Sequence, residues 1–224
     1  MSRRKNNTCV FCGRPAPTMD HVPPEGIFPD PKPRDLITVP ACNYCNKGSS
    51  KDEEYFRAII TTAEGNNEFA VQLVNQKIIP RFRRKPLLLK SIMRDAKKVD
   101  VYSEGGIYLG KYPAIPYKSQ RIQSVVEKII RALFWHETKM VLGTDYDVGR
   151  FILNPNFDEQ KKRAIVSLPL KNVGDGKVFS YRYLFDEKDK RISCWWLMFF
   201  NATLLMALTE PIVAEKEPKS EKMS

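Results

Sequence analysis

Two cysteine pairs constrain this chain more than any other feature of its sequence. Cys9 and Cys12 form "CVFC", and Cys42 and Cys45 form "CNYC". No apolar run of signal-peptide length follows "MSRRKNNTC", so we expect a reducing compartment, where cysteines bind metal rather than form disulfides. Zinc takes four thiolates in a tetrahedron, and a two-residue gap lets one tight turn direct both sulfurs at the same ion. The pattern therefore predicts a structural zinc site on four cysteines.

The segment between the pairs, residues 13–41, is longer than in a common zinc ribbon and must carry structure of its own. It contains "MDHVPP", with Asp20 and His21 just before two prolines. Residues that precede proline favour extended conformations, so His21 and Val22 are expected to end a strand. Neighbouring strand residues point to opposite faces, so Asp20 and His21 need a local bend to serve one site. Zinc on the second cysteine pair would hold the next helix against this strand.

Together, the motifs "C-x-x-C … D-H-x-x-P … P-A-C-x-x-C-N-x-G" over residues 9 to about 56 resemble the HNH endonuclease family. The similarity is to the subgroup of this ββα-metal fold that is stapled by four cysteines. It implies that His21 is the general base and that Asp20 and Asn46 hold one divalent ion, Mg²⁺ or Mn²⁺. It also implies cleavage products with 5′-phosphate and 3′-hydroxyl ends.

The residue types suit this chemistry independently of the resemblance. Phosphodiester hydrolysis needs a deprotonated water, neutralised charge at phosphorus and help for the leaving oxygen. An imidazole with an ordinary pKa of about 6.5 can take the proton at neutral pH. A hard cation on oxygen ligands such as Asp20 and Asn46 can neutralise the phosphate, and the neutral asparagine keeps the negative charge of the site low.

One position departs from the family pattern. The family places a middle asparagine nine positions before the last one, which corresponds to Ile37 in this chain. An isoleucine cannot make the hydrogen bonds of that asparagine. Asp35 or Thr38 can substitute only if the register of the loop shifts, so catalytic competence depends on this region.

Structural roles for the same residues stay open. His21 can be a hydrogen-bonded structural residue, or a zinc ligand if one cysteine is free. Asn46 can simply cap a helix. His136 is expected to be a structural or a surface residue. Cys194, in an apolar run, is expected to lie in the core.

The charge balance indicates a polyanionic partner. The chain has 37 Lys and Arg residues against 26 Asp and Glu residues, a net charge of +11. We expect nucleic acid, with DNA in preference to RNA, although a basic soluble protein without such a partner is also compatible. Residues 81–98 are strongly basic and can either neutralise phosphates or form a solvated helix face. The predicted nucleic-acid-binding residues are Arg81, Arg83, Arg84, Lys85 and Lys90.

The patterns before residue 119 predict mostly helices. "SKDE" reads as a capping box with Ser50 as the N-cap of a helix that carries an apolar stripe. A second helix, about residues 68–79, is expected to stop at Pro80. Alternation around Gly105 and Gly106 predicts a hairpin.

The patterns after residue 119 predict one long helix and then strands. The helix spans about residues 119–140, with Gly143 as its stop signal. "KVFSYRYLF", "ISCWWLMFF" and "ATLLMAL" read as strands whose tyrosines pack a sheet. The Lys/Glu-rich tail after Pro211 is expected to be mobile.

These elements predict an α+β fold with two parts. Residues 1–65 would form a zinc-stapled, treble-clef-like HNH module, and residues 66–224 an α+β region for substrate recognition or oligomerisation. The apolar stretch Trp195–Leu208 is too short and too interrupted to span a bilayer, so no membrane association is expected. A cytoplasmic location is the corresponding expectation.

The predicted function is metal-dependent endonucleolytic cleavage of DNA. The main alternative is a catalytically inactive, zinc-dependent nucleic-acid-binding protein, which Ile37 would favour. A third possibility is an interaction protein whose zinc knuckle only holds the fold. A nuclease with one site per chain would need two copies to break both strands, so a homodimer is possible.

Overall fold

The computed structural model describes residues 8–63, 65–94, 96–103, 105–114 and 116–212. The expectation of a mobile C-terminal tail therefore falls largely outside the described residues. No helix within these ranges combines the length and the apolar character that a bilayer span requires.

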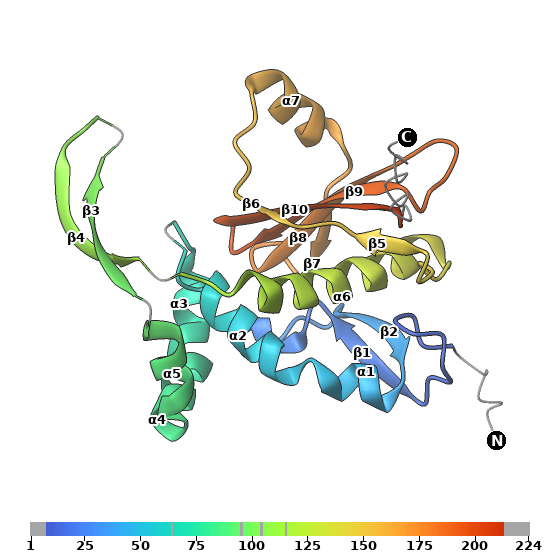
Figure 1. Ribbon diagram of the computed structural model, residues 1–224, viewed down its shortest axis with the longest axis horizontal. Helices are drawn as coiled ribbons and strands as arrows, with labels where there is room; N and C mark the ends of the chain where they lie inside the picture. The colour runs from blue at the N-terminus through green and yellow to red at the C-terminus, as the bar shows by residue number, and fades with distance from the viewer. Residues whose placement is uncertain (1–7, 64, 95, 104, 115, 213–224) are drawn as a thin grey trace, which may run out of the picture.

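Helix α6 (Ser119–Thr138) is the central element of the fold (Figure 1). One side of α6 faces the large C-terminal sheet, and the other faces an N-terminal layer of strands and helices. The apolar stripe predicted from its sequence is buried in full: Ile122, Val125, Val126, Ile129, Ile130, Leu133 and Phe134. Buried residues from both sides of position 65 join one apolar core around this helix, and the boundary at 65 stays a prediction.

The N-terminal layer begins with an antiparallel strand pair. β1 (Thr18–Val22) and β2 (Ile37–Ala41) align His21 opposite Thr38 and Val22 opposite Ile37. A short 3-10 helix, η1 (Glu25–Ile27), lies in the connection between the strands. Two helices follow β2 directly, α1 (Asn43–Gly48) and α2 (Ser50–Ile60).

The C-terminal sheet has six strands in the order β5-β10-β9-β8-β7, with β6 also paired to β10. The elements are β5 (Tyr146–Val148), β6 (Ile152–Leu153), α7 (Glu159–Ser167), β7 (Lys171–Val173), β8 (Phe179–Phe185), β9 (Ser193–Phe199) and β10 (Thr203–Pro211). Trp195, Leu197 and Phe199 alternate along β9 and are completely buried toward α6, as expected for a half-buried strand. The three strands predicted here are confirmed.

Helices and a hairpin fill the region between α2 and α6. The elements are α3 (Glu68–Leu73), the π-helical turn η2 (Val74–Ile78), α4 (Ile79–Arg84), α5 (Pro86–Met93), β3 (Lys97–Tyr102) and β4 (Tyr108–Ala114). The predicted hairpin is confirmed: among the described strands, β3 and β4 pair only with each other, and Gly106 has φ +80° in the connecting turn. Figure 1 shows this hairpin projecting away from the body of the protein.

One predicted helix end and one predicted stop signal are wrong. Pro80 does not end the helical region, because a π-helical turn leads into α4, where Pro80 lies in the first turn. A proline there lacks only an N–H that has no acceptor within the helix. Helix α6 ends at Thr138, close to the predicted end at about residue 140, but its stop is Lys139 rather than Gly143. Lys139 adopts φ 58° and donates its N–H to the Trp135 carbonyl at 2.8 Å.

The predicted N-cap of α2 is displaced by one residue. Ser49, not Ser50, precedes the first residue of the helix. The Ser49 carbonyl accepts the Glu53 N–H at 2.9 Å, and its hydroxyl donates to the Glu53 carboxylate at 2.5 Å. The predicted capping box does not form, because the two side chains bond to each other and the Ser49 side chain caps no backbone N–H.

Cys194 is another correction, because it is half-buried rather than a core residue. It alternates with the buried Trp195 along β9 and therefore points to the opposite face of the sheet. The tyrosines of β8 do pack the sheet as predicted. The hydroxyls of Tyr181 and Tyr183 donate to the two carboxylate oxygens of Glu137 on α6, at 2.5 and 2.7 Å.

This carboxylate should make stability depend on pH. Burial opposes the charged form of Glu137, but the two tyrosine hydroxyls and Lys171 outweigh it and lower its pKa below 4.5. A depressed pKa stabilises the fold above the unfolded value and loses that contribution as the pH falls through the folded value. We expect Glu137→Gln to lower the free energy of unfolding at pH 7 by about 1.5–3 kcal/mol.

Urea unfolding of both proteins at pH 7 and near pH 4 measures this effect. The gap between wild type and variant should shrink at the lower pH. An equal gap at both pH values would show that the charge of Glu137 is not what anchors β8 to α6.

Candidate functional site

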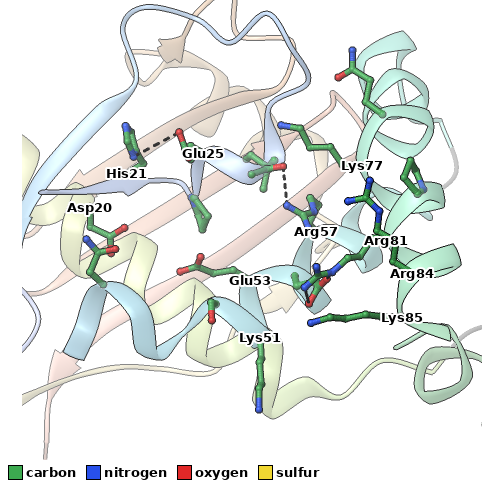
Figure 2. A pocket seen from close by; sticks show the side chains of 18 residues that line it. Asp20, His21, Glu25, Lys51, Glu53, Arg57, Lys77, Arg81, Arg84 and Lys85 are labelled. Atoms are coloured by element: carbon green, nitrogen blue, oxygen red, sulfur yellow. Dashed lines mark hydrogen bonds and ion pairs between the residues drawn. The ribbon is translucent and has the colours of Figure 1, made fainter. Parts of the chain in front are cut away.

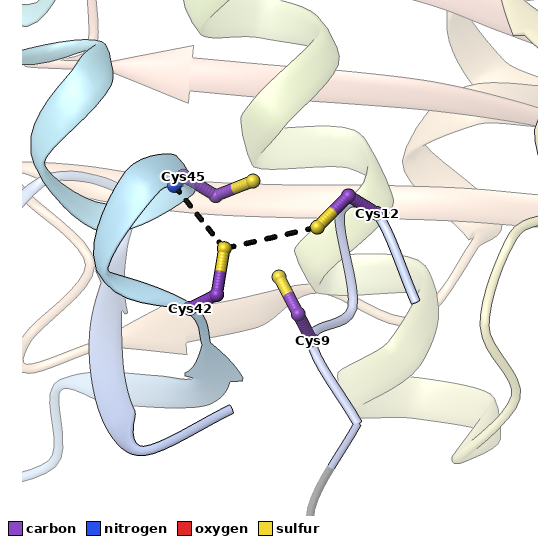
Figure 3. A group of neighbouring side chains, drawn as sticks. All are labelled: Cys9, Cys12, Cys42 and Cys45. Carbon is purple, nitrogen blue, oxygen red and sulfur yellow. Dashed lines mark hydrogen bonds between the residues drawn. The ribbon is translucent and has the colours of Figure 1, made fainter. Parts of the chain in front are cut away.

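The four cysteines of the two pairs form one cluster (Figure 3). Their sulfur atoms all lie within 4.8 Å of one another, and the Sγ atoms of Cys12 and Cys42 are 3.7 Å apart. A tetrahedral zinc ion with Zn–S bonds of about 2.3 Å separates its sulfur ligands by about 3.8 Å. The cluster can therefore hold one metal ion such as zinc, which was the main prediction from the cysteine spacing.

Local turns direct each pair of thiols inward. The Cys9 carbonyl accepts the Gly13 N–H at 2.9 Å, and Gly13 adopts φ +72°, which closes the first turn. In the second pair, the Cys45 N–H donates to Cys42 Sγ at 3.4 Å at the start of α1. A metal ion on these thiols would fix the start of α1 against the N-terminal turn.

The surroundings of the cluster favour the thiolate form at Cys12 and Cys42 and oppose it at Cys45. The Arg14 guanidinium donates to Cys12 Sγ at 3.3 Å and is the main reason that the pKa of Cys12 falls to about 6. The backbone N–H of Cys45 lowers the pKa of Cys42, while burial raises that of Cys45 itself. Metal binding requires deprotonated thiols, so the set matches a thiophilic cation.

A cleft of about 780 Å³ is lined in part by Asn46, the residue that follows Cys45 in α1 (Figure 2). Residues from β1, η1, α1, α2, η2 and α4 line it. Asp20 and His21 from β1 and Asn46 from α1 all belong to its lining. The three residues that the sequence singled out for chemistry therefore share one open cavity.

Asp20 is buried at the floor of the cleft and bound to a lysine from α6. Its Oδ2 lies 2.7 Å from Lys128 Nζ, which also contacts Glu53 Oε1 at 2.7 Å. Burial raises the pKa of Asp20, and the nearby ammonium of Lys128 lowers it only in part. Burial likewise disfavours the charged form of Lys128, but Asp20 and Glu53 outweigh it and raise the pKa of the ammonium.

Asn46 is fixed to β1 by its amide nitrogen. Its Nδ2 donates to Thr18 Oγ1 at 3.1 Å and to the Met19 carbonyl at 3.0 Å. This use of the NH₂ group leaves the amide oxygen as the atom that can coordinate a cation. With Asp20 one residue beyond Met19, the donor set is a carboxylate and an amide oxygen, which fits a hard divalent ion.

His21 is partly exposed rather than packed into the core. Its side chain is 39% exposed, and its Nδ1 lies 4.0 Å from Glu25 Oε2. Figure 2 shows His21 and Asp20 leaving β1 on opposite sides. The pairing with β2 is unbroken through both residues, so the local bend expected between them does not form.

The position of the missing asparagine is part of the core. Ile37 is buried in β2 opposite Val22. Asp35, one candidate substitute, accepts the Gly174 N–H at 3.0 Å with both carboxylate oxygens and so holds a distant loop. Thr38, the other candidate, is exposed directly across the ladder from His21, on the same face of the strand pair.

The far wall of the cleft is basic. Of the predicted nucleic-acid-binding residues, Arg81, Arg84 and Lys85 line it. Arg83 and Lys90 are exposed but do not belong to this lining. Arg81 forms an ion pair with Glu54 on α2.

Sequence reasoning missed three cationic residues that line this site, Lys51, Arg57 and Lys77, and a fourth, Lys128, that contacts Asp20 from α6. All four come from segments that carry apolar helical patterns. Lys128 adjoins the apolar stripe of α6, and Arg57 directly follows Phe56 in the stripe of α2. A basic residue beside a buried stripe is the only signal in the sequence that marks them.

Comparison of the chain with protein-family models, with curated proteins and with solved structures gave no match.

Removing one cysteine should release the metal ion. We expect the wild-type protein to contain one zinc per chain and Cys42→Ser to contain little, because three thiolates hold the ion less well than four. Elemental analysis of the purified proteins measures this directly, with Cys194→Ser as the matched control. Zinc retained by Cys42→Ser, or lost equally from both variants, would contradict binding at the cluster.

Proposed function

We propose that the protein is a metal-dependent endonuclease that hydrolyses phosphodiester bonds in DNA, as the resemblance to the HNH family implies. The observation that carries this proposal is the cleft itself. An acidic and amide end, with Asp20 and Asn46, lies across from a basic wall, with an exposed histidine at its edge. Such a cavity can bind a cation and the phosphates of a nucleic acid at the same time.

Asp20 and Asn46 would hold the divalent ion, Mg²⁺ or Mn²⁺. The carboxylate remains bound to Lys128, and the asparagine amide remains tied to β1, so both oxygens are held in place before any ligand arrives. When bound, the ion supplies neutralisation of the phosphate and stabilisation of the leaving oxygen.

His21 would act as the general base. Its side chain is partly exposed at the edge of the cleft, where a ring nitrogen can accept a proton from water. The attacking water gives its proton to His21 while its oxygen bonds to phosphorus. The bond from phosphorus to the 3′-oxygen then breaks, and that oxygen takes a proton from solvent, giving a 5′-phosphate and a 3′-hydroxyl.

The four-cysteine cluster would serve structure rather than catalysis. Its ligands leave no position open for water once four thiolates bind. The cluster holds the start of α1, and α1 carries Asn46 one residue after Cys45. Loss of its metal ion would therefore change the cleft, because α1 and with it Asn46 would no longer be held in place.

The second candidate function is binding of nucleic acid without cleavage. Burial of Ile37 and the engagement of Asp35 with Gly174 favour it, because neither residue can replace the middle asparagine of the family. Asp20 and His21 also leave β1 on opposite sides, without the bend that a shared catalytic site requires. The basic wall of the cleft would serve this function equally well.

Cleavage of supercoiled plasmid in Mg²⁺ or Mn²⁺ tests the proposal. We expect wild type to nick the plasmid and His21→Ala to do so about 10²–10⁴-fold more slowly, since a general base contributes about that factor. DNA binding should be unchanged in this variant.

His136→Ala is the matched control, because this histidine lies on α6 outside the lining of the cleft. It should cleave like wild type. Binding by wild type without nicking, in either divalent ion, would reject the nuclease and support the binding protein.

A further inference from the structure

Arg57 occupies an unusual position in the cleft. It belongs to α2 and is half-buried between η1 and α4 (Figure 2). Its Nη1 donates to the Gly26 carbonyl at 3.3 Å, and its Nε is buried without a hydrogen-bond acceptor among the described residues. Burial lowers its pKa, although a guanidinium stays charged at neutral pH.

Its guanidinium also lacks a direct ion pair among the described residues, although Glu54 and Glu53 lie near enough to favour its charged form. Within the described ranges, no carboxylate forms an ion pair with Arg57, whereas its neighbours Arg81 and Lys77 are paired with Glu54 and Asp30. A partly buried charge without a partner is unfavourable unless something else compensates for it. Since Arg57 lines the cleft, an anion in the cleft can provide that compensation.

Two more cations border the same place. Arg84 and Lys85 line the cleft from α4 and its end, and neither is paired with a described carboxylate. Figure 2 shows Arg57, Arg84 and Lys85 together across the cleft from Asp20 and His21. The two nearby carboxylates, Glu54 and Glu53, already form ion pairs with Arg81 and Lys128, so this wall keeps an excess of positive charge.

We propose that Arg57, Arg84 and Lys85 form a phosphate subsite for a second, uncleaved phosphodiester of the nucleic-acid strand whose scissile phosphate lies at Asp20 and His21. The proposal rests on the proposed function for the identity of the strand. The two ends of the cleft differ in charge, so one phosphate cannot occupy both. A strand lying along the cleft places one phosphate at each end, whereas a mononucleotide has only one phosphodiester-like group to offer.

Gly26 provides a second way to probe this subsite. A Cβ added to Gly26 would lie 2.5 Å from Arg57 Nη1 and would meet no other atom within 3 Å. The end of the arginine side chain can move, so Gly26→Ala should fold while displacing the guanidinium. This variant keeps the charge of Arg57 but changes its position.

The test is the binding of a fluorescent oligonucleotide by the full-length, zinc-loaded protein in Ca²⁺, over a range of salt concentrations. We expect Arg57→Met to weaken binding on the order of 10- to 100-fold. The slope of log affinity against log salt concentration should become less steep by about one. The loss of affinity should be similar for oligonucleotides of different sequence. Gly26→Ala should weaken binding in the same direction.

Arg163→Met is the matched control, because Arg163 is an exposed arginine on α7, outside the cleft. It should bind like wild type with an almost unchanged slope. Arg57→Met with wild-type affinity and slope would overturn the subsite, even if the protein cleaves DNA. No binding by wild type would overturn it as well.

A failure of the proposed function gives a different result. If wild type binds but does not cleave in Mg²⁺ or Mn²⁺, while Arg57→Met loses affinity and slope, the subsite stands and the nuclease does not. Normal cleavage by wild type, together with an unchanged slope for Arg57→Met, would support the nuclease and overturn the subsite.

Discussion

The contact of Lys128 with Asp20 and Glu53 joins the central helix to the floor of the cleft. The ammonium lies 2.7 Å from an oxygen of each carboxylate, and its side chain is only 10% exposed. Removing one partner from such a buried network costs about 3–5 kcal/mol, because the remaining charges stay out of water. Since β1, α2 and α6 each contribute one charge, the network also fixes where Asp20 lies relative to the rest of the protein.

Two further constraints place the other groups of the site relative to this network. The four thiols can hold one metal ion and with it the start of α1, which carries Asn46. The contact of Arg81 with Glu54 holds α4 against α2, so the basic wall faces Asp20 across the cavity. The cleft therefore combines an oxygen-rich end and a cationic end on elements that are joined by ionic or metal-binding contacts.

Features that are set by residues close together in the sequence were predictable, and features that depend on contacts between distant segments were not. The spacing of the cysteines, the stripe of α6 and the turn at Gly106 follow from local geometry. Lys128 and Arg57 follow from packing between elements, because their sequence positions resemble ordinary polar flanks of a helix. The continuation of the helical region through Pro80 was also not predicted, since a π-helical turn leaves no clear signal in the sequence.

The central claim is that Asp20 and Asn46 bind a divalent cation beside the phosphate of a nucleic acid. Anomalous diffraction at the manganese edge tests it most directly, from crystals of the His21→Ala protein with Mn²⁺ and an uncut oligonucleotide. We predict a manganese peak within about 2.5 Å of an Asp20 carboxylate oxygen and the Asn46 amide oxygen, separate from the metal on the cysteines. Well-ordered bound oligonucleotide with no manganese at these two oxygens would contradict the claim.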